Sequence, residues 1–229
     1  MRLDEIEWED VELVPQEVRA QKQENVSGII SVSRRPFVFD AVKLAQTAQT
    51  TLEPEIKLLL DKHVFTYIKL PVNIRPRNEY DVRFISVDVV LESEDNQTVC
   101  WSMEPLLVEQ EIRLKTESAL SGGLKLHALE LGISDNVAGE YVLYQPKVTA
   151  FGIGQSNPGW EFEPTAGSEL RGVQILHMVV LIPNNTHATG IVTIKADIFK
   201  EGWLWNYRAR NRNDGGEKML KIDLPGITS

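Results

Sequence analysis

Aromatic and cationic side chains gather near the C-terminal end of this 229-residue chain, in the segment WLWNYRARNR. The candidate binding residues of this segment are Trp203, Trp205, Tyr207, Arg208, Arg210 and Arg212. Aromatic rings stack on sugars or fill the centre of a protein interface, and guanidinium groups bind anions. The alternative is that the two tryptophans close one end of the hydrophobic core while the arginines stay in solvent.

Carboxylates and aromatic rings alternate in WEFEP, which begins at Trp160. Successive side chains of a strand point to opposite sides, so Glu161 and Glu163 share one side, and Trp160 and Phe162 share the other. Two carboxylates at this spacing could serve a glycosidase or bind a cation. We favour the simpler interpretation, in which both rings are buried and both glutamates are solvated.

Cys100 is the only cysteine, and the four histidines are His63, His127, His177 and His187. A cysteine nucleophile needs a helix N-terminus or a cationic neighbour that lowers the thiol pKa. Cys100 lies in a strand-like pattern instead, so we predict a buried structural thiol and rank a Cys–His hydrolase as the weakest alternative. No two histidines have the spacing of a local metal pair, so no metal site is predicted.

The glycine-rich stretch GIGQSNPG, residues 152–159, lacks the serine elbow of hydrolases and the lysine of a phosphate-binding loop. We interpret it as the connection of a β-hairpin that leads into WEFEP. With no catalytic or cofactor-binding motif present, the sequence predicts a protein that is not an enzyme and that binds no cofactor.

One helical segment is predicted over residues 40–62. Asp40 can cap its first turn, because a carboxylate accepts the free N–H groups at a helix start. Ala41, Leu44 and Ala45 follow with helical spacing, and Pro54 should break or kink the segment. We expect this segment to pack over one open end or edge of the remaining structure.

Strand patterns occupy most of the other residues. Pro71 lacks a backbone donor, so its strand is predicted at a sheet edge or with a bulge. In YDVRFISVDVVL the apolar residues change parity, which predicts a β-bulge at Phe84–Ile85 or a strand that passes between sheets. The predicted strands are 28–33, 66–74, 80–91, 98–103, 107–114, 123–133, 141–151, 160–164, 173–182 and 191–199.

Many short strands separated by turns are typical of an all-β antiparallel sandwich, immunoglobulin-like or jelly-roll-like. Residues 173–182 are apolar at nearly every position, so we expect their strand in the middle of the structure. The acidic segment 1–24 contains Trp8 among spaced apolar residues, and we expect it to dock on the rest of the chain. The predicted division is therefore this segment and one domain over 25–229.

The formal net charge is −9, which disfavours nucleic acid as a partner. The lone cysteine and the acidic N-terminus, which does not resemble a signal peptide, predict a cytoplasmic protein without a membrane partner. We therefore predict a non-enzymatic intracellular module that mediates protein–protein interaction or self-association, with Trp8 and the C-terminal aromatic segment as its surfaces. A sandwich that binds a carbohydrate or another small ligand is the alternative.

Overall fold

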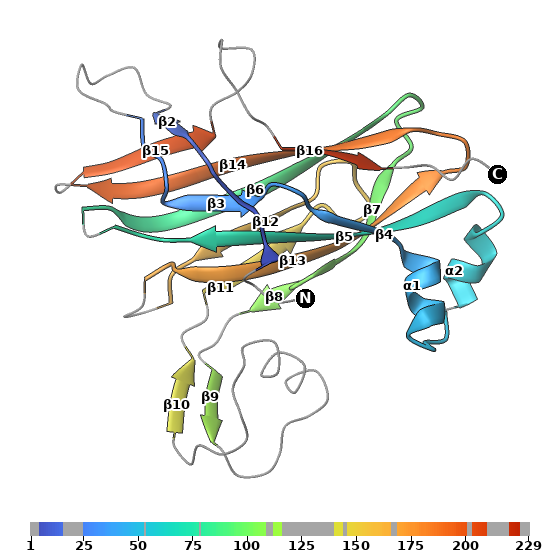
Figure 1. Cartoon of the computed structure of the whole chain (residues 1–229), viewed down its shortest axis with the longest axis horizontal. Helices are drawn as coiled ribbons and strands as arrows, with labels where there is room; N and C mark the ends of the chain where they lie inside the picture. Colours follow the sequence, from blue (N-terminus) through green and yellow to red (C-terminus); the bar gives the residue numbers. More distant parts are fainter. Residues whose placement is uncertain are drawn as a thin grey trace.

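The protein is an all-β sandwich of antiparallel sheets, with a short helical segment beside one end (Figure 1). The computed structural model describes residues 5–15, 25–52, 54–77, 79–108, 112–115, 140–143, 146–165, 169–200, 203–209 and 220–224. The predicted fold class is confirmed. The division into an N-terminal segment and one domain stays a prediction.

The six-stranded sheet has the order β1-β3-β5-β13-β7, and β4 also pairs with β5. Its strands are β1 (Trp8–Asp10), β3 (Ile30–Ser33), β4 (Phe37–Asp40), β5 (His63–Ile74), β7 (Val99–Glu104) and β13 (Gly172–Pro183). The β5–β13 pair is in register over its whole length, from Ile74 opposite Gly172 to His63 opposite Pro183. This long pair forms the middle of the sheet, where the apolar segment 173–182 was expected.

The eight-stranded sheet has the order β2-β15-β14-β6-β12-β11-β8, and β16 also pairs with β14. Its strands are β2 (Leu13–Pro15), β6 (Asp81–Ser93), β8 (Leu107–Val108), β11 (Lys147–Phe151), β12 (Gly159–Glu163), β14 (Ala188–Lys200), β15 (Trp203–Ala209) and β16 (Leu220–Leu224). A separate two-stranded sheet, β9 (Ile112–Lys115) with β10 (Glu140–Leu143), projects from the sandwich (Figure 1). The expected strand at 123–133 lies outside the described residues.

The hydrophobic core lies between the two large sheets. Trp160 and Phe162 of β12 are 1% and 0% exposed, and they pack in one cluster with Ile68 of β5 and Val180 of β13. Glu161 and Glu163 are exposed on the opposite side of β12. The interpretation of WEFEP as a strand with buried rings and solvated carboxylates is confirmed.

Residues 152–158 connect β11 to β12, as the glycine-rich sequence predicted. Gly152 has a φ of +80°, and a Cβ atom there would lie 2.5 Å from the Asn157 carbonyl oxygen. The connection also bonds to β7, because Cys100 N–H donates to Gln155 O at 3.0 Å and Gly154 N–H donates to Cys100 O at 2.8 Å. This loop therefore closes one side of the sandwich.

The parity change in β6 arises from a β-bulge, as predicted, but one position earlier than expected. Asp197 of β14 lies opposite Phe84, whereas the next residue, Ile198, lies opposite Val82. Arg83 is thus the extra residue of the bulge. This single insertion lets both Val82 and Ile85 point into the core.

The prediction that the Pro71 strand lies at a sheet edge or carries a bulge is wrong. β5 has partners on both sides and its pairing with β13 shows no register shift. On the other side of β5, the pairing with β3 ends at Val72, and the pairing with β4 begins at Lys69. Pro71 lies in the gap between these two partners, so its missing N–H costs no ladder hydrogen bond there.

The acidic N-terminal segment docks on its own chain within the described residues 5–15. β1 pairs with β3 of the six-stranded sheet and β2 pairs with β15 of the eight-stranded sheet. Asp10 pairs with Arg75 at 2.5 Å and accepts from the Ser31 hydroxyl at 2.6 Å. This stretch therefore links both sheets along one side, and the prediction that it docks is confirmed.

The predicted helical segment forms two short helices, α1 (Ala41–Thr47) and α2 (Pro54–Leu59). They lie beside the end of the sandwich, past β4 and the start of β5 (Figure 1). Asp40 is the N-cap of α1. Pro54 is the first residue of α2, a position whose N–H makes no hydrogen bond within the helix, so the missing N–H of proline costs nothing there. Among the described residues, no helix is long and apolar enough to cross a membrane.

Candidate functional site

The outward side of the six-stranded sheet carries aromatic side chains where an exposed sheet face is ordinarily polar. Ile68 and Leu70 of β5 point into the core and are 1% and 3% exposed. Tyr67 and Lys69 alternate with them and so point away from the core. Phe39 and Phe37 of β4 lie directly opposite these two residues, on the same outward side.

The neighbouring strand β13 continues this outward side. Val179 lies opposite Tyr67 and His177 lies opposite Lys69, while Met178 between them is buried at 2% exposure. Hydrophobic and aromatic residues therefore face outward across β4, β5 and β13, with Lys69 as a charged side chain between Phe37 and His177.

A β-bulge in β7 adds Trp101 to the same side. Cys100 lies opposite Val180 and Ser102 lies opposite Val179, so Trp101 is the extra residue. A bulge redirects side chains, and here the indole turns away from the core that receives Cys100. The Trp101 ring meets Phe65 of β5 edge-on, with centroids 5.5 Å apart and planes at 87°.

We call this surface the aromatic face; it consists of Phe37, Phe39, Phe65, Tyr67, Trp101 and His177. Phe39 is 46% exposed, and Phe65 is buried beneath its neighbours at 1%. The Tyr67 ring lies 6.3 Å from the ring of Phe39 and 5.8 Å from that of His177. Three rings from three strands thus form one continuous row.

The row also contains a polar contact. The Tyr67 hydroxyl and Nδ1 of His177 are joined by a short hydrogen bond, in which the imidazole tautomer decides the donor. Glu104 of β7 lies opposite His177 at the far end of the row and is exposed. The face therefore combines apolar ring surface with polar atoms at its rim.

A pocket of about 350 Å³ adjoins the aromatic face at its helical end. Its lining residues are Asp40, Val42, Leu60, His63, Val64, Phe65, Asn184 and Asn185. Phe65 belongs to both the pocket and the aromatic face. His63 Nδ1 is buried, and no hydrogen-bond partner for it lies among the described residues.

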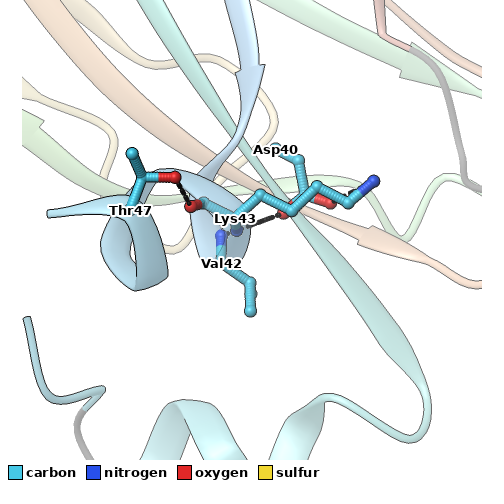
Figure 2. A network of polar contacts seen from close by, with 4 residues as sticks. All are labelled: Asp40, Val42, Lys43 and Thr47. Carbon is cyan, nitrogen blue, oxygen red and sulfur yellow. Dashed lines mark hydrogen bonds and ion pairs between the residues drawn. The ribbon is translucent and has the colours of Figure 1, made fainter. Parts of the chain in front are cut away.

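Asp40 connects the aromatic face to the helices. Its Oδ1 atom accepts from the N–H groups of Val42 at 2.9 Å and Lys43 at 3.0 Å (Figure 2). These are free first-turn donors of α1, so the cap fixes where the helix leaves β4. The Thr47 hydroxyl donates to the Lys43 carbonyl at 2.9 Å in the last turn.

Of the binding residues predicted from sequence, the side chains of Trp8 and Tyr207 are described, and these two residues lie on different sheets. Tyr207 is buried at 4% exposure, and Trp8 is half-buried on β1, opposite Ser33. The backbone of β15 carries Trp203, Trp205 and Arg208, whose side chains lie outside the described residues. Arg210 and Arg212 lie outside them altogether. Their role in binding stays a prediction.

The thiol of Cys100 is buried, as predicted. Burial raises its pKa to about 12, and the hydrogen bond to the Ser102 carbonyl only partly opposes this shift. The thiolate required of a nucleophile is therefore scarce near neutral pH. Among the described residues, no group of three His, Cys, Asp or Glu side chains is placed to hold a metal ion.

Sequence reasoning did not identify the aromatic face. One signal was present: residues 173–182 are apolar at positions of both parities, which we interpreted only as central placement. Central placement is correct, but the second apolar side faces outward at Val179 and does not meet a further layer of described strands. The remaining rings come from β4, β5 and β7, which are far apart in sequence.

No protein-family model matches the chain, and no curated protein matches it. Among solved structures, it is similar to the Clostridium perfringens NetB toxin in the membrane inserted form, at 9% identity over 95% of this chain and 94% of that chain, with a TM-score of 0.33. It is also similar to the Clostridium perfringens delta-toxin, at 11% identity over 96% and 86%, with a TM-score of 0.33.

These neighbours contradict three predictions made from the sequence. Both neighbours are toxins, and one is in a membrane inserted form. These neighbours do not fit the predicted module for protein interaction or self-association, the predicted cytoplasmic location, or the predicted absence of a membrane partner. The ligand-binding and hydrolase alternatives are set aside with that function. A similarity at this TM-score carries no positive argument, so the function must rest on the chain's own residues.

Proposed function

We propose that the protein binds the surface of lipid membranes through the aromatic face. The half-exposed row of Phe39, Tyr67 and His177 on the outer side of the six-stranded sheet is the observation that carries this proposal. Tyrosine and tryptophan favour the boundary between lipid headgroups and acyl chains, because one end of each side chain is apolar and the other is polar. Tyr67 and Trp101 supply both types.

The charge of the chain selects the lipid class. The formal net charge is −9, so anionic headgroups repel the protein as a whole. The rings of the aromatic face gain free energy by leaving water, which requires no charge on the lipid. Neutral zwitterionic lipids such as phosphatidylcholine are therefore the expected partners.

The expected affinity is moderate. Burying a complete phenylalanine side chain contributes about 1.5–3 kcal/mol, so the exposed half of Phe39 contributes about 1 kcal/mol. Tyr67 and Trp101 are more covered than Phe39 and contribute less each. Several such contributions give reversible attachment to a surface, in contrast to the permanent insertion of a spanning helix.

Sedimentation with phosphatidylcholine vesicles tests the proposal. The protein should move from the supernatant to the vesicle pellet as lipid increases, and to a similar extent at about 0.1 M and about 1 M salt, because salt screens charges and leaves apolar burial in place. Protein that stays in the supernatant at every lipid concentration would contradict membrane binding. Binding that requires anionic lipid and disappears at high salt would contradict the role of the aromatic face.

A further inference from the structure

Neither helix of the helical segment buries any residue, although both carry apolar side chains. Leu44 of α1 is 41% exposed and Leu58 of α2 is 81% exposed. The helices have 7 and 6 residues, which is too short for helices that are stable without packing. Leu44 and Leu58 therefore lack the cover that would normally support helices of this length.

The helical segment continues directly from the aromatic face. Phe39 is the outward ring of β4, Asp40 ends that strand, and α1 starts at Ala41. The Asp40 cap holds the junction, as Figure 2 shows. A surface that receives the Phe39 ring is thus also close to the first turn of α1.

Packing beneath the helices is incomplete. The pocket of about 350 Å³ lies between residues of the helical segment, Val42 and Leu60, and the sandwich residues Val64 and Phe65. This pocket is open to solvent, so the sandwich does not fully cover the side of the helices that faces it. Val42, Ile56 and Leu59 are half-buried, whereas Leu44 and Leu58 are left exposed.

We propose that α1 and α2 form a second membrane contact, in which Leu44 and Leu58 enter the boundary between headgroups and acyl chains. This inference rests on the proposed binding of the aromatic face to membranes. A lipid surface fits better than a protein partner because the exposed leucines continue an exposed aromatic surface and are flanked by lysines. Lys43 is 76% exposed, and Lys57 lies in the last turn of α2. Long lysine side chains keep their ammonium groups in the headgroup region while their neighbours are buried.

An environment-sensitive dye attached to Leu58→Cys tests this contact. Cys100 is buried with a pKa of about 12, so the introduced cysteine should be the site that reacts near neutral pH. Addition of phosphatidylcholine vesicles should shift the emission of the dye to the blue. Glu161→Cys is the matched control, because Glu161 is exposed on the outward side of β12 in the eight-stranded sheet, away from the proposed contact; its dye should shift much less.

The outcomes separate the two proposals. Protein that sediments with vesicles while the dye at position 58 shows no shift would overturn the helical contact and leave the aromatic face intact. Equal shifts at positions 58 and 161 would also overturn it, because the dye on the eight-stranded sheet should stay in water. Protein that never sediments would overturn both proposals.

A second variant does not depend on the dye. Leu58→Asp places a charge at a site that is 81% exposed, so folding should be retained. The vesicle affinity should fall by about fivefold or more, because a charged side chain resists transfer from water. A folded variant with unchanged affinity would overturn the proposal.

Discussion

The outward sides of the two large sheets differ sharply, although both sheets enclose the same core. On the six-stranded sheet, Phe39, Tyr67 and His177 form a row of rings. On the eight-stranded sheet, the corresponding side mixes polar groups with separate apolar ones: Lys195 pairs with Asp88 at 2.7 Å, and Phe199 is 37% exposed. Polar residues keep a sheet face in water, whereas the aromatic face lowers its free energy by leaving water.

The difference arises from the alternation of residues in the central strands β13 and β14. β14 alternates apolar and polar residues, so that Ile194 and Ala196 are buried and Lys195 between them is exposed. β13 has Val179 where such an alternation would place a polar residue. A strand with apolar residues on both sides therefore lies in an outer layer here, and the proposed membrane contact would account for its second apolar side.

Two tryptophans give the largest expected difference between inner and outer positions. Trp160→Ala should lower the free energy of unfolding by about 3–5 kcal/mol, because the 1% exposed indole leaves a cavity in the core. Trp101→Ala should cost about 1–2 kcal/mol, since Trp101 is half-buried on the aromatic face. Urea unfolding measures the difference between the two losses of unfolding free energy, provided that the slope of this free energy against urea concentration is the same in both variants. Equal losses would mean that the aromatic face is as structural as the core.

The second prediction concerns the cap of α1. Asp40→Ala removes the acceptor of two first-turn N–H groups and should lower helix stability by about 1 kcal/mol. Amide hydrogen exchange should accelerate in residues 41–47 and stay unchanged in β14. Asp40→Asn is the control, because asparagine also caps helices and should restore most of the protection. Unchanged exchange in the alanine variant would show that the cap does not hold α1.

The smallest effect is expected where the N-terminal segment meets the six-stranded sheet. Asp10 and Arg75 pair at 2.5 Å, but their side chains are 54% and 48% exposed. Asp10→Asn should therefore lower the free energy of unfolding by only about 0.2–1 kcal/mol, and by less at high salt. Thermal unfolding at two salt concentrations measures this. A loss larger than that of Trp101→Ala would show that the link between the sheets depends on this pair.

Much of the fold was predictable from the sequence because its signals are local. Alternation located β12 and β14, the Asp40 cap located the start of α1, and the glycine at 152 marked the hairpin. The bulge in β6 was predicted within one residue, because the buried residues change parity at the position where the extra residue is inserted. The Pro71 prediction considered an edge strand or a bulge, but a gap between two partner strands also leaves a proline without a ladder hydrogen bond to make.

The candidate site was not predictable because its members come together only through strand pairing. Phe39, Tyr67 and His177 lie on three strands, and their contact depends on registers that no local pattern fixes. Trp101 joins them through a β-bulge opposite Val179 and Val180. The Trp and Arg residues at 203–212 were predicted as a binding segment because they are adjacent in the sequence. A surface assembled from several strands has no such local signal.

Two phenylalanines test the central claim most directly. Phe39 on the aromatic face is 46% exposed and Phe199 on the eight-stranded sheet is 37% exposed, so Phe39→Ser and Phe199→Ser remove similar side chains from opposite sheets. Sedimentation with phosphatidylcholine vesicles should show an affinity about fivefold lower for Phe39→Ser, from a loss of about 1 kcal/mol, and an unchanged affinity for Phe199→Ser. Equal affinities for the two variants, or a larger loss for Phe199→Ser, would contradict membrane binding through the aromatic face.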